Sequence, residues 1–308
     1  MKKSQPTITI DCLGLGIIPL DILLEIPSFP DLGGKRNASD MIMQGGGPVP
    51  NTMIGLTRLG LRTAVIAAIG RDMIGDLSRK ELTKERVDTS HLIVKREFSD
   101  LAAGFVEQKS GRRTIVLHRK LEITPRDLKL SSLPIPKLVH VDGRDVPACV
   151  KLARWAKSVG AIVSFDIGSL RNDVSPLLPL VDQLVVADAF ALPFTRTRTA
   201  KAAIKKLSQV CPGTIIITEG TAGQLAYENG IFTRGRSFKV PVVDTTGAGD
   251  AFHTGYLYGL LHGWPIERRL IFGAAIAALK CGSMGARTGL PSLSQANRFL
   301  KSKPRQYA

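Results

Sequence analysis

One short segment, Asp244-Thr-Thr-Gly-Ala-Gly-Asp-Ala-Phe-His-Thr-Gly255, combines a strand end, a glycine turn, a helix start and a carboxylate. A helix is predicted to begin near Gly249, so unpaired backbone N–H groups would lie at the positive end of a helix dipole, where anions bind. Asp250 falls in the first helical turn, within reach of whatever those amides hold, and a carboxylate there can act as a general base. Taken alone, the string is more typical of a tight connection followed by a helix-start acid.

The elements on either side of this segment would position it. Residues 238–243 are rich in β-branched side chains and predict a strand, whereas apolar residues recur at helical spacing from Phe252 to Leu261. Residues 265–280 then predict a helix rich in alanine and glycine. Its small side chains would permit close packing against a neighbouring element or a flat ligand.

A second glycine-rich turn lies earlier in the chain. Gly45-Gly-Gly-Pro-Val-Pro-Asn51 is predicted to open an apolar helix that runs through Leu59 and ends at Gly60. Three glycines ahead of a helix let a ligand lie against the backbone, although a flexible loop with an N-terminal proline fits the pattern as well. Residues 63–69 predict a buried strand, and residues 70–75 a turn that begins another helix.

Two segments are predicted to form a small sheet outside the main one. Residues 8–15 read as the first strand of the main sheet, and a further extended run containing Asp21 reaches Ile26. Residues 27–44 are rich in turn formers and predict an irregular or edge-strand excursion. Residues 97–119 predict a hairpin. A lid over a binding site is the natural use of such a sheet, and a purely decorative hairpin is the alternative.

Beyond residue 137 the pattern is regular. Predicted strands at 138–142, 161–166, 184–187 and 214–218 alternate with helices at 146–158 and 197–210, which indicates a parallel sheet covered by helices on both faces. In such folds ligands bind beyond the carboxyl ends of the strands. Asp142, Asp166 and Thr218-Glu-Gly220 follow strand ends, so they are expected to converge there, although a strand-end aspartate is also a common turn former or helix cap.

Composition narrows the class of protein. The 308 residues, 44% of them hydrophobic, suit one large α/β unit with an appendage. A formal net charge of +16 favours anionic partners such as phosphorylated metabolites, nucleotides or nucleic acid. The positive residues are dispersed and only 6% of residues are aromatic, so a nucleic-acid stacking surface has little support.

The cysteines and the N-terminal segment indicate a location. Four cysteines stand far apart and there are only five histidines, so no structural zinc pattern occurs and reduced thiols in the cytosol are the simplest interpretation. Charged residues and a proline interrupt the first apolar stretch, and we predict neither a targeting segment nor a membrane span. We therefore expect a cytoplasmic protein.

Four motifs together resemble a known family. They are Gly45-Gly-Gly-Pro-x-x-Asn51, Ile69-Gly70-x-Asp72-x-x-Gly75, Thr218-x-Gly220-x-x-Gly223 and Asp244-Thr-Thr-Gly-Ala-Gly-Asp250. They appear in the order found in the ribokinase-like (PfkB) carbohydrate kinases, and the resemblance covers essentially the whole chain. Within that family, segments such as Asp250-x-Phe-His253 and Ala278-Leu-Lys-Cys281 look most like sulfofructose kinases. Ser110-Gly-x-Arg113 and Gly143-Arg144 look like ketohexokinases.

The resemblance implies a fold and a set of roles. It implies a single domain over 1–308, with a three-layer α/β/α fold, a mostly parallel central sheet and a small β lid formed by segments at about 17–44 and 97–119. ATP and Mg²⁺ would be required, a need for K⁺ stays open, and the lid would pair two copies into a homodimer. Asp250 would be the base, and the amides of Gly247, Ala248 and Gly249 would stabilise the transferring phosphoryl group. Asp21, Gly46, Gly47, Asn51 and Arg144 would bind substrate, and Thr218, Gly220, Gly223, Arg113, Ala278 and Cys281 would bind nucleotide.

This chain departs from the family pattern in three places. Many members place an Asn-x-x-Glu motif, tied to Mg²⁺, where this sequence has Ala187-Asp188-Ala-Phe190, so the metal ligands stay unassigned. Pro48 replaces a sugar-binding asparagine of the ketohexokinases, which argues against simple ketohexose recognition. Leu117 and His118 stand where sulfofructose kinases would have an amide, so a sulfonate substrate is only a candidate.

The sequence thus favours an ATP-dependent kinase that phosphorylates a hydroxyl of a sugar or sugar derivative, with the positive charge favouring an acidic one such as a sulfosugar. Two alternatives stay open. A nucleoside kinase of the same superfamily would use the same catalytic parts, and a degenerate kinase would bind sugar or nucleotide without catalysis. Binding of nucleic acid or a membrane is not expected.

Overall fold

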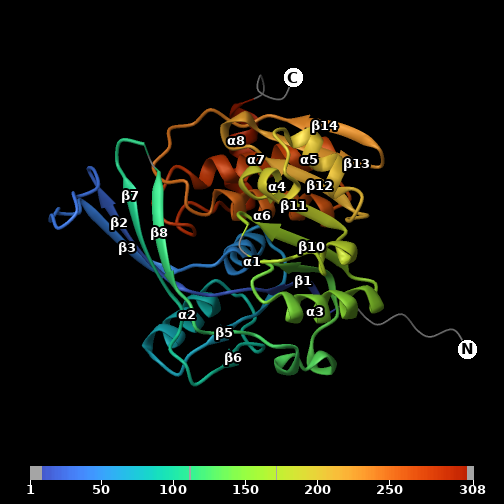
Figure 1. The fold of residues 1–308 in the computed structure, drawn as a ribbon, viewed down its shortest axis with the longest axis horizontal. Helices are drawn as coiled ribbons and strands as arrows, with labels where there is room; N and C mark the ends of the chain where they lie inside the picture. Colours follow the sequence, from blue (N-terminus) through green and yellow to red (C-terminus); the bar gives the residue numbers. More distant parts are fainter. Residues whose placement is uncertain (1–8, 111, 171, 304–308) are drawn as a thin grey trace, which may run out of the picture.

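The main sheet of the computed structural model, which describes residues 9–110, 112–170 and 172–303, has eight strands (Figure 1). Six strands run parallel to their neighbours, and the last two extend the sheet as an antiparallel hairpin. Across the sheet the order is β14 (Ile231–Gly235), β13 (Gln224–Glu228), β12 (Thr214–Thr218), β11 (Gln183–Ala187), β10 (Ile162–Ile167), β9 (Pro136–Val141), β1 (Ile10–Leu15) and β4 (Thr63–Ile66).

Helices cover both faces of this sheet, because its strands are apolar on both sides. Val139 and Val141 pack against one group of helices, and the preceding Leu138 packs against the other. The first face carries α3 (Val146–Ser158), α4 (Asp188–Thr195) and α5 (Ala200–Leu207). The second carries α1 (Pro48–Arg58), α2 (Met73–Lys84), α6 (Ala248–Leu261), α7 (Ile266–Lys280) and α8 (Leu293–Ser302). The predicted three-layer architecture with a mostly parallel central sheet is confirmed.

A separate four-stranded sheet projects from the main body, at the left of Figure 1. Its order is β3 (Asp40–Gly45), β2 (Leu20–Ile26), β7 (Leu101–Glu107) and β8 (Arg113–His118), with β2 and β7 parallel. Strands alternate their side chains between two faces. One face carries a row in register across the sheet, Met43, Ile22, Ala103 and Val116, in which Met43 and Val116 are exposed. The other face carries Asp21, Leu23, Ala102 and Leu117.

Two strand predictions need correction. Residues 238–243 form no strand: Phe238 packs against Ala274, Ala275 and Ala278 of α7, so its apolar side chain serves a helix contact instead of the sheet. Residues 63–69 are not one strand either. The main-sheet strand ends at Ile66, because the carbonyl of Ala67 accepts a hydrogen bond from Ile93 N at 2.9 Å. Residues Ala68–Ile69 (β5) then pair with Ile93–Val94 (β6).

Other boundaries differ by a few residues. The helix predicted at 197–210 is shorter, since the Thr199 hydroxyl accepts a hydrogen bond from Ala202 N and caps α5. Short 3₁₀ turns occur at Pro125–Asp127, Leu130–Ser132, Leu178–Leu180 and Gly220–Ala222. The four cysteines are free and buried. Within the described ranges, no helix combines the length and the apolar character that a membrane crossing needs.

Candidate active site

A cavity of about 650 Å³ lies where three parts of the chain meet. The carboxyl ends of the parallel strands form its floor, the inner face of the small sheet forms one wall, and the turn before α6 forms another. The strand-end residues Asp142, Asp166 and Thr218 line this one cavity, as the sequence predicts. The cavity is also lined by the glycine turn of residues 244–250, through Thr245, Thr246, Gly247, Gly249 and Asp250.

The turn before α6 is held in one conformation, and one of its amides, Ala248 N, donates a 3.1 Å hydrogen bond to the Thr245 carbonyl. Gly247, the N-cap of the helix, has φ of 74°, and a Cβ there would lie 2.7 Å from Cβ of Ala286, so both backbone and space require glycine. The buried Asp244 carboxylate accepts hydrogen bonds from Thr246 N at 2.8 Å and Gly285 N at 2.8 Å, which fixes the turn from behind. Gly249 is exposed, and a Cβ on it would touch no protein atom. These features leave a helix N-terminus open toward the cavity, which suits an anion.

Asp250 stands in the first turn of α6 and lines the cavity. Its Oδ2 accepts a hydrogen bond of 2.7 Å from Nδ2 of Asn51 in α1. Burial, helped by the negative charge of Asp166, raises the pKa of Asp250 to about 6, against the opposing effect of the Asn51 hydrogen bond. A carboxylate with this pKa is ionised at neutral pH and still basic enough to accept a proton from a hydroxyl group.

A buried polar cluster lies beside Asp250. Asp166 Oδ1 is 3.1 Å from Nε2 of His253, which lies one helical turn after Asp250. Burial alone would raise the pKa of Asp166, but His253 outweighs it, and the pKa of Asp166 lies below its usual range. His140, fully buried with its Nδ1 3.1 Å from the Ser164 hydroxyl, has its pKa lowered to about 3 by burial and stays neutral. Ligand atoms of Asp166, His253 and His140 lie within 4.8 Å of one another, and within this group Asp166 and His253 are bound to each other.

The glycine-rich turn before α1 lies against Asp21. A Cβ on Gly46 would lie 2.2 Å from Oδ1 of Asp21, and Gly47, with φ of 92°, lines the cavity. Asp21 also lines the cavity, and burial raises its pKa to about 7 although the charge of Arg287 opposes this. The structure thus brings Asp21, Gly46, Gly47 and Asn51 together at one side of Asp250.

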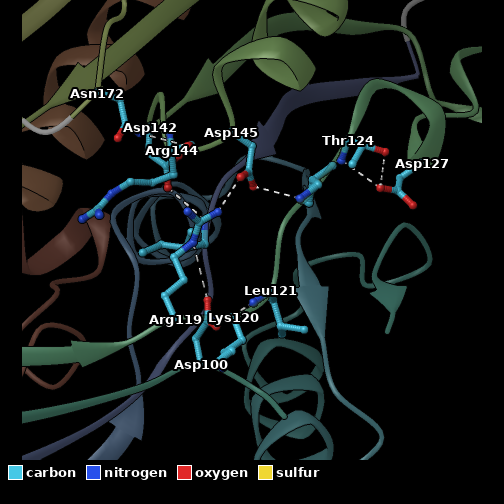
Figure 2. A network of polar contacts seen from close by, with 12 residues as sticks. Asp100, Arg119, Lys120, Leu121, Thr124, Asp127, Asp142, Arg144, Asp145 and Asn172 are labelled. Carbon is cyan, nitrogen blue, oxygen red and sulfur yellow. Dashed lines mark hydrogen bonds and ion pairs between the residues drawn. The ribbon is translucent and has the colours of Figure 1, made fainter. Parts of the chain in front are cut away.

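Arg144 reaches the cavity from the loop after β9. Its backbone is fixed, because Oδ1 of Asp142 accepts a hydrogen bond from Arg144 N at 3.0 Å and Asn172 Nδ2 donates to Arg144 O at 3.1 Å. The other oxygen of Asp142 accepts from Ile17 N at 2.9 Å. Figure 2 shows the Arg144 side chain extending away from this backbone cluster, and the residue lines the cavity.

Arg119, just beyond the end of β8, anchors the small sheet to the main body (Figure 2). Its guanidinium bonds to Asp145, the N-cap of α3, and lies 3.8 Å from Oδ2 of Asp100. Asp100 Oδ1 accepts hydrogen bonds from the backbone of Lys120 and Leu121, and Asp145 Oδ2 accepts one from Ile123 N. Two carboxylates from different elements therefore converge on one arginine at the base of the sheet.

The residues predicted to bind nucleotide fall into two groups. Thr218, Gly220 and Arg113 line the cavity, and Arg113 Nη1 donates a 2.8 Å hydrogen bond to the carbonyl of Thr245 in the turn before α6. Gly223, Ala278 and Cys281 are not among the lining residues. Gly223 has φ of 93°, and a Cβ there would lie 2.3 Å from the carbonyl of Gly235. Ala278 and Cys281 are buried, and Ala278 packs under Phe238.

Sequence reasoning missed three charged residues near the site. Arg287 and Glu81 form an ion pair of 2.9 Å behind the glycine-rich turn, and Lys280, fully buried, donates to the carbonyl of Asp244 at 2.7 Å. Lys280 could have been noticed as the lysine that ends the apolar stretch 270–279, but a lysine at the end of a helix is also common. Arg287 lies in the irregular loop between α7 and α8, and no local sequence pattern indicates its role.

Comparisons with known proteins agree with this geometry. The family model described as pfkB family carbohydrate kinase matches residues 9–293. A 5-dehydro-2-deoxygluconokinase of Geobacillus thermodenitrificans is 25% identical, with 83% of this chain and 84% of that protein covered. The ribokinase of Haemophilus influenzae is 27% identical, with 93% and 97% covered.

A solved structure has the same fold. It is an Escherichia coli protein described as a ribokinase II, in complex with ATP and Mg²⁺, and it superimposes with a TM-score of 0.82 at 22% identity, covering 96% of this chain and all of that chain. The glycine turns, the carboxylate at the α6 N-terminus and the family match over residues 9–293 lead to one conclusion. The chain belongs to the pfkB family of carbohydrate kinases, phosphotransferases with an alcohol group as acceptor.

Proposed function

We propose that this kinase transfers the γ-phosphoryl group of ATP to a hydroxyl of a sugar or sugar derivative, with Asp250 as the base. The observation that carries the proposal is the position of Asp250, whose carboxylate, with a pKa of about 6, lines the cavity one turn from an open helix N-terminus. The substrate hydroxyl would give its proton to Asp250 while its oxygen forms a bond to the γ-phosphorus, and the bond from that phosphorus to ADP breaks. The amides of Gly247 and Gly249, which line the cavity, would stabilise charge on the transferring group. The Ala248 amide, predicted to share this role, donates instead to the Thr245 carbonyl.

Substrate and nucleotide would occupy opposite sides of Asp250. Asp21, Gly47 and Asn51, which line the cavity, would hold sugar hydroxyls. Gly46 would support them from behind, because its N–H donates to Pro19 O and its carbonyl accepts from Arg287. Thr218 and Gly220, at the end of β12, would lie along the nucleotide, and Arg113 could reach a phosphate from β8. Gly223, Ala278 and Cys281 do not line the cavity, so they would support the nucleotide site through packing and would not contact the nucleotide.

Magnesium fits the residues at the end of β11. Asp188, in the first turn of α4, lines the cavity and takes the place of the missing Asn-x-x-Glu motif as a carboxylate source. Mg²⁺ is commonly bound by one or two carboxylates together with substrate phosphates and water, so one such residue suffices. The bound ion would neutralise charge on the phosphate oxygens. A need for K⁺ stays open, and its addition belongs in the assay.

The acceptor is proposed to be acidic. Arg144 lines the cavity, with its backbone fixed by Asp142 and Asn172. A guanidinium matches carboxylate, sulfonate and phosphate geometry. One relative is named as a 5-dehydro-2-deoxygluconokinase, and this name supports a sugar acid as the acceptor. A sulfosugar is the second candidate among acidic acceptors.

The direct test is an ADP-release screen with Mg²⁺, with and without K⁺, across neutral sugars, sugar acids, sulfosugars and nucleosides. Turnover of a sugar or sugar acid supports the proposal, and preferential turnover of adenosine, inosine or cytidine would identify a nucleoside kinase instead. Binding without ADP release in every class would indicate a degenerate kinase. With the best substrate, Asp250→Asn should lower kcat by roughly 10²–10⁴-fold and leave ATP binding nearly intact.

The role of Arg144 has its own control. Arg144→Ala should raise KM for an acidic substrate at least tenfold, while KM for its neutral analogue changes little, because only the acidic one loses an ion pair in the cavity. Equal effects on both substrates would contradict an anion-binding role. Arg196→Ala, an arginine at the C-terminal end of α4, outside the cavity lining, serves as the matched control for loss of charge.

We also propose that the small sheet is a lid inserted in a single domain, and that it pairs two copies. Its inner face lines the cavity through Asp21, Ala102 and Leu117, whereas its outer face presents exposed Met41, Met43 and Val116. A second copy of this apolar face is the simplest cover for it. Light scattering should give a dimer for the wild type and a monomer for Val116→Glu.

A further inference from the structure

We propose that Arg287 is a positioning residue that holds the Asn51 amide in the one orientation in which its nitrogen donates to Asp250. The inference deepens the proposed function, because it assumes that Asp250 is the base. Arg287 lies in the loop between α7 and α8, 236 residues from Asn51 in sequence, and touches neither reacting group. It would act on catalysis only through Asn51 and the glycine-rich turn.

The contacts form a chain across three elements. Arg287 is 3% exposed; its Nε donates to Oδ1 of Asn51 at 2.8 Å, and its Nη2 donates to the carbonyl of Gly46 at 2.9 Å. Its Nη1 forms the 2.9 Å ion pair with Glu81 of α2, which also accepts from Gly45 N at 2.5 Å. Asn51, itself 3% exposed, then donates from Nδ2 to Asp250 at 2.7 Å.

The donor and acceptor types at the two ends fix the amide orientation. A guanidinium has only donors, so the Asn51 group that faces it must be the oxygen. The amide nitrogen then necessarily faces the Asp250 carboxylate, which has only acceptors when ionised. The reversed amide would set N–H against N–H and lone pair against lone pair. The Asn51 amide therefore lies between a hydrogen-bond donor, Arg287, and a hydrogen-bond acceptor, Asp250.

Loss of Arg287 would remove this constraint. The amide could reverse, and the charged form of Asp250 would lose the hydrogen bond that favours it. Other charged or titratable groups near Asp250 are Asp166 and His253, Arg113 and Asp21 on the small sheet, and Lys280 on α7. None of them donates to Asp250 Oδ2 in place of Asn51 among the contacts found within the described residues. Removing a hydrogen bond to a charged group raises the pKa of a carboxyl by about one unit or more.

The test compares Arg287→Met with Arg58→Met. Arg58 Nη1 donates to the carbonyls of Arg287 and Leu290 at 2.8 Å each, so its removal loosens the same loop without touching Asn51. In protein labelled with ¹³C at aspartate carboxyls, the Asp250 signal is assigned by its absence in Asp250→Asn. We expect Asp250 to titrate at least one unit higher in Arg287→Met than in the wild type, and unchanged in Arg58→Met. The lower apparent pKa in the pH profile of kcat/KM should rise by the same amount in Arg287→Met.

Two further variants separate positioning from general support. Asn51→Leu should raise the Asp250 pKa as Arg287→Met does, and the double variant should add little, because both changes remove the same hydrogen bond. If Arg287→Met does not fold, Arg287→Gln replaces it: its amide can donate or accept, so it no longer dictates which way Asn51 faces, and the same rise is expected. An unchanged Asp250 titration in the folded variant, or full additivity, overturns the proposal. If the wild type phosphorylates no substrate, the proposed function fails, while the titration still decides the role of Arg287.

Discussion

Asp250→Asn should make the protein more stable at neutral pH while it removes activity. The folded-state pKa of Asp250 is raised from 3.8 to about 6, first by burial and then by the charge of Asp166. Burial and the charge of Asp166 both destabilise the ionised form of the Asp250 carboxylate in the folded protein. Asparagine has the same shape, can still accept the Asn51 hydrogen bond through its oxygen, and carries no charge, so it removes the penalty and keeps the contact.

The magnitude follows from linkage. A shift from 3.8 to about 6 corresponds to about 3 kcal/mol in the free energy of unfolding at a pH above both values. Asp250 is only partly buried by accessible surface, so solvent screening reduces the expected gain to about 1–2 kcal/mol. For a chain of this size that gain is a rise in Tm of about 2–5 °C.

The pH dependence gives the sharper test. Above pH 6 the carboxylate is ionised in both folded and unfolded chains, and the destabilisation is fully present. As the pH falls from 6 toward 3.8 the folded chain takes up its proton first, and the difference between wild type and Asp250→Asn should disappear. Tm values measured at pH 7.5 and pH 4 should therefore differ between the two proteins only at the higher pH. An exposed control, Asp31→Asn, should show no such pattern, and a less stable Asp250→Asn at pH 7.5 would refute the account of the Asp250 environment.

Two other changes test the supports of the site. Lys280→Met should lower the free energy of unfolding by about 3–5 kcal/mol in urea titration, because it leaves the fully buried Asp244 carboxylate without its cation; a loss below 1 kcal/mol would contradict that pairing. Arg119→Met should cost about 2–3 kcal/mol and speed amide hydrogen exchange in β8 more than in β12, since Asp100 and Asp145 lose their shared partner at the base of the small sheet. Equal acceleration in both strands would indicate global destabilisation instead.

The turn before α6 could be predicted from sequence because its signals are local. The two glycines, Asp250 and the helical spacing after Phe252 lie within a few residues, and helix α6 begins at Ala248, next to the predicted Gly249. The order of βα units likewise predicts Asp142, Asp166 and Thr218 at one edge of the sheet, and all three line the cavity. Sequence patterns that span a few residues or repeat with a strict period therefore predict the folded structure correctly.

Contacts between distant segments could not be predicted. Nothing near Arg287 in sequence indicates that Asn51 and Gly46, more than 200 residues earlier, would fold against it. The same limit explains the strand wrongly predicted at residues 238–243. Its apolar side chains satisfy a β pattern, but Phe238 buries itself on the small residues of α7, and Pro241 supplies no N–H for a ladder. Whether an apolar segment meets a sheet or a helix depends on tertiary packing.

The two ends of β8 are held by contacts of unequal strength, and this bears on how substrate enters. At its start, the exposed Arg113 donates to the Thr245 carbonyl, a contact that competes with water. Just past its end, Arg119 is 19% exposed and joins two carboxylates whose side chains are 3% and 8% exposed. Breaking the Arg113 contact returns a guanidinium to solvent. Breaking the Arg119 contacts leaves two buried carboxylates without a cation. Opening of the small sheet is therefore expected to begin at Arg113, beside the turn that would hold the phosphates, with Arg119 as the fixed end. Arg113, which is proposed to reach a phosphate, is then also the residue whose release would free this end of the small sheet.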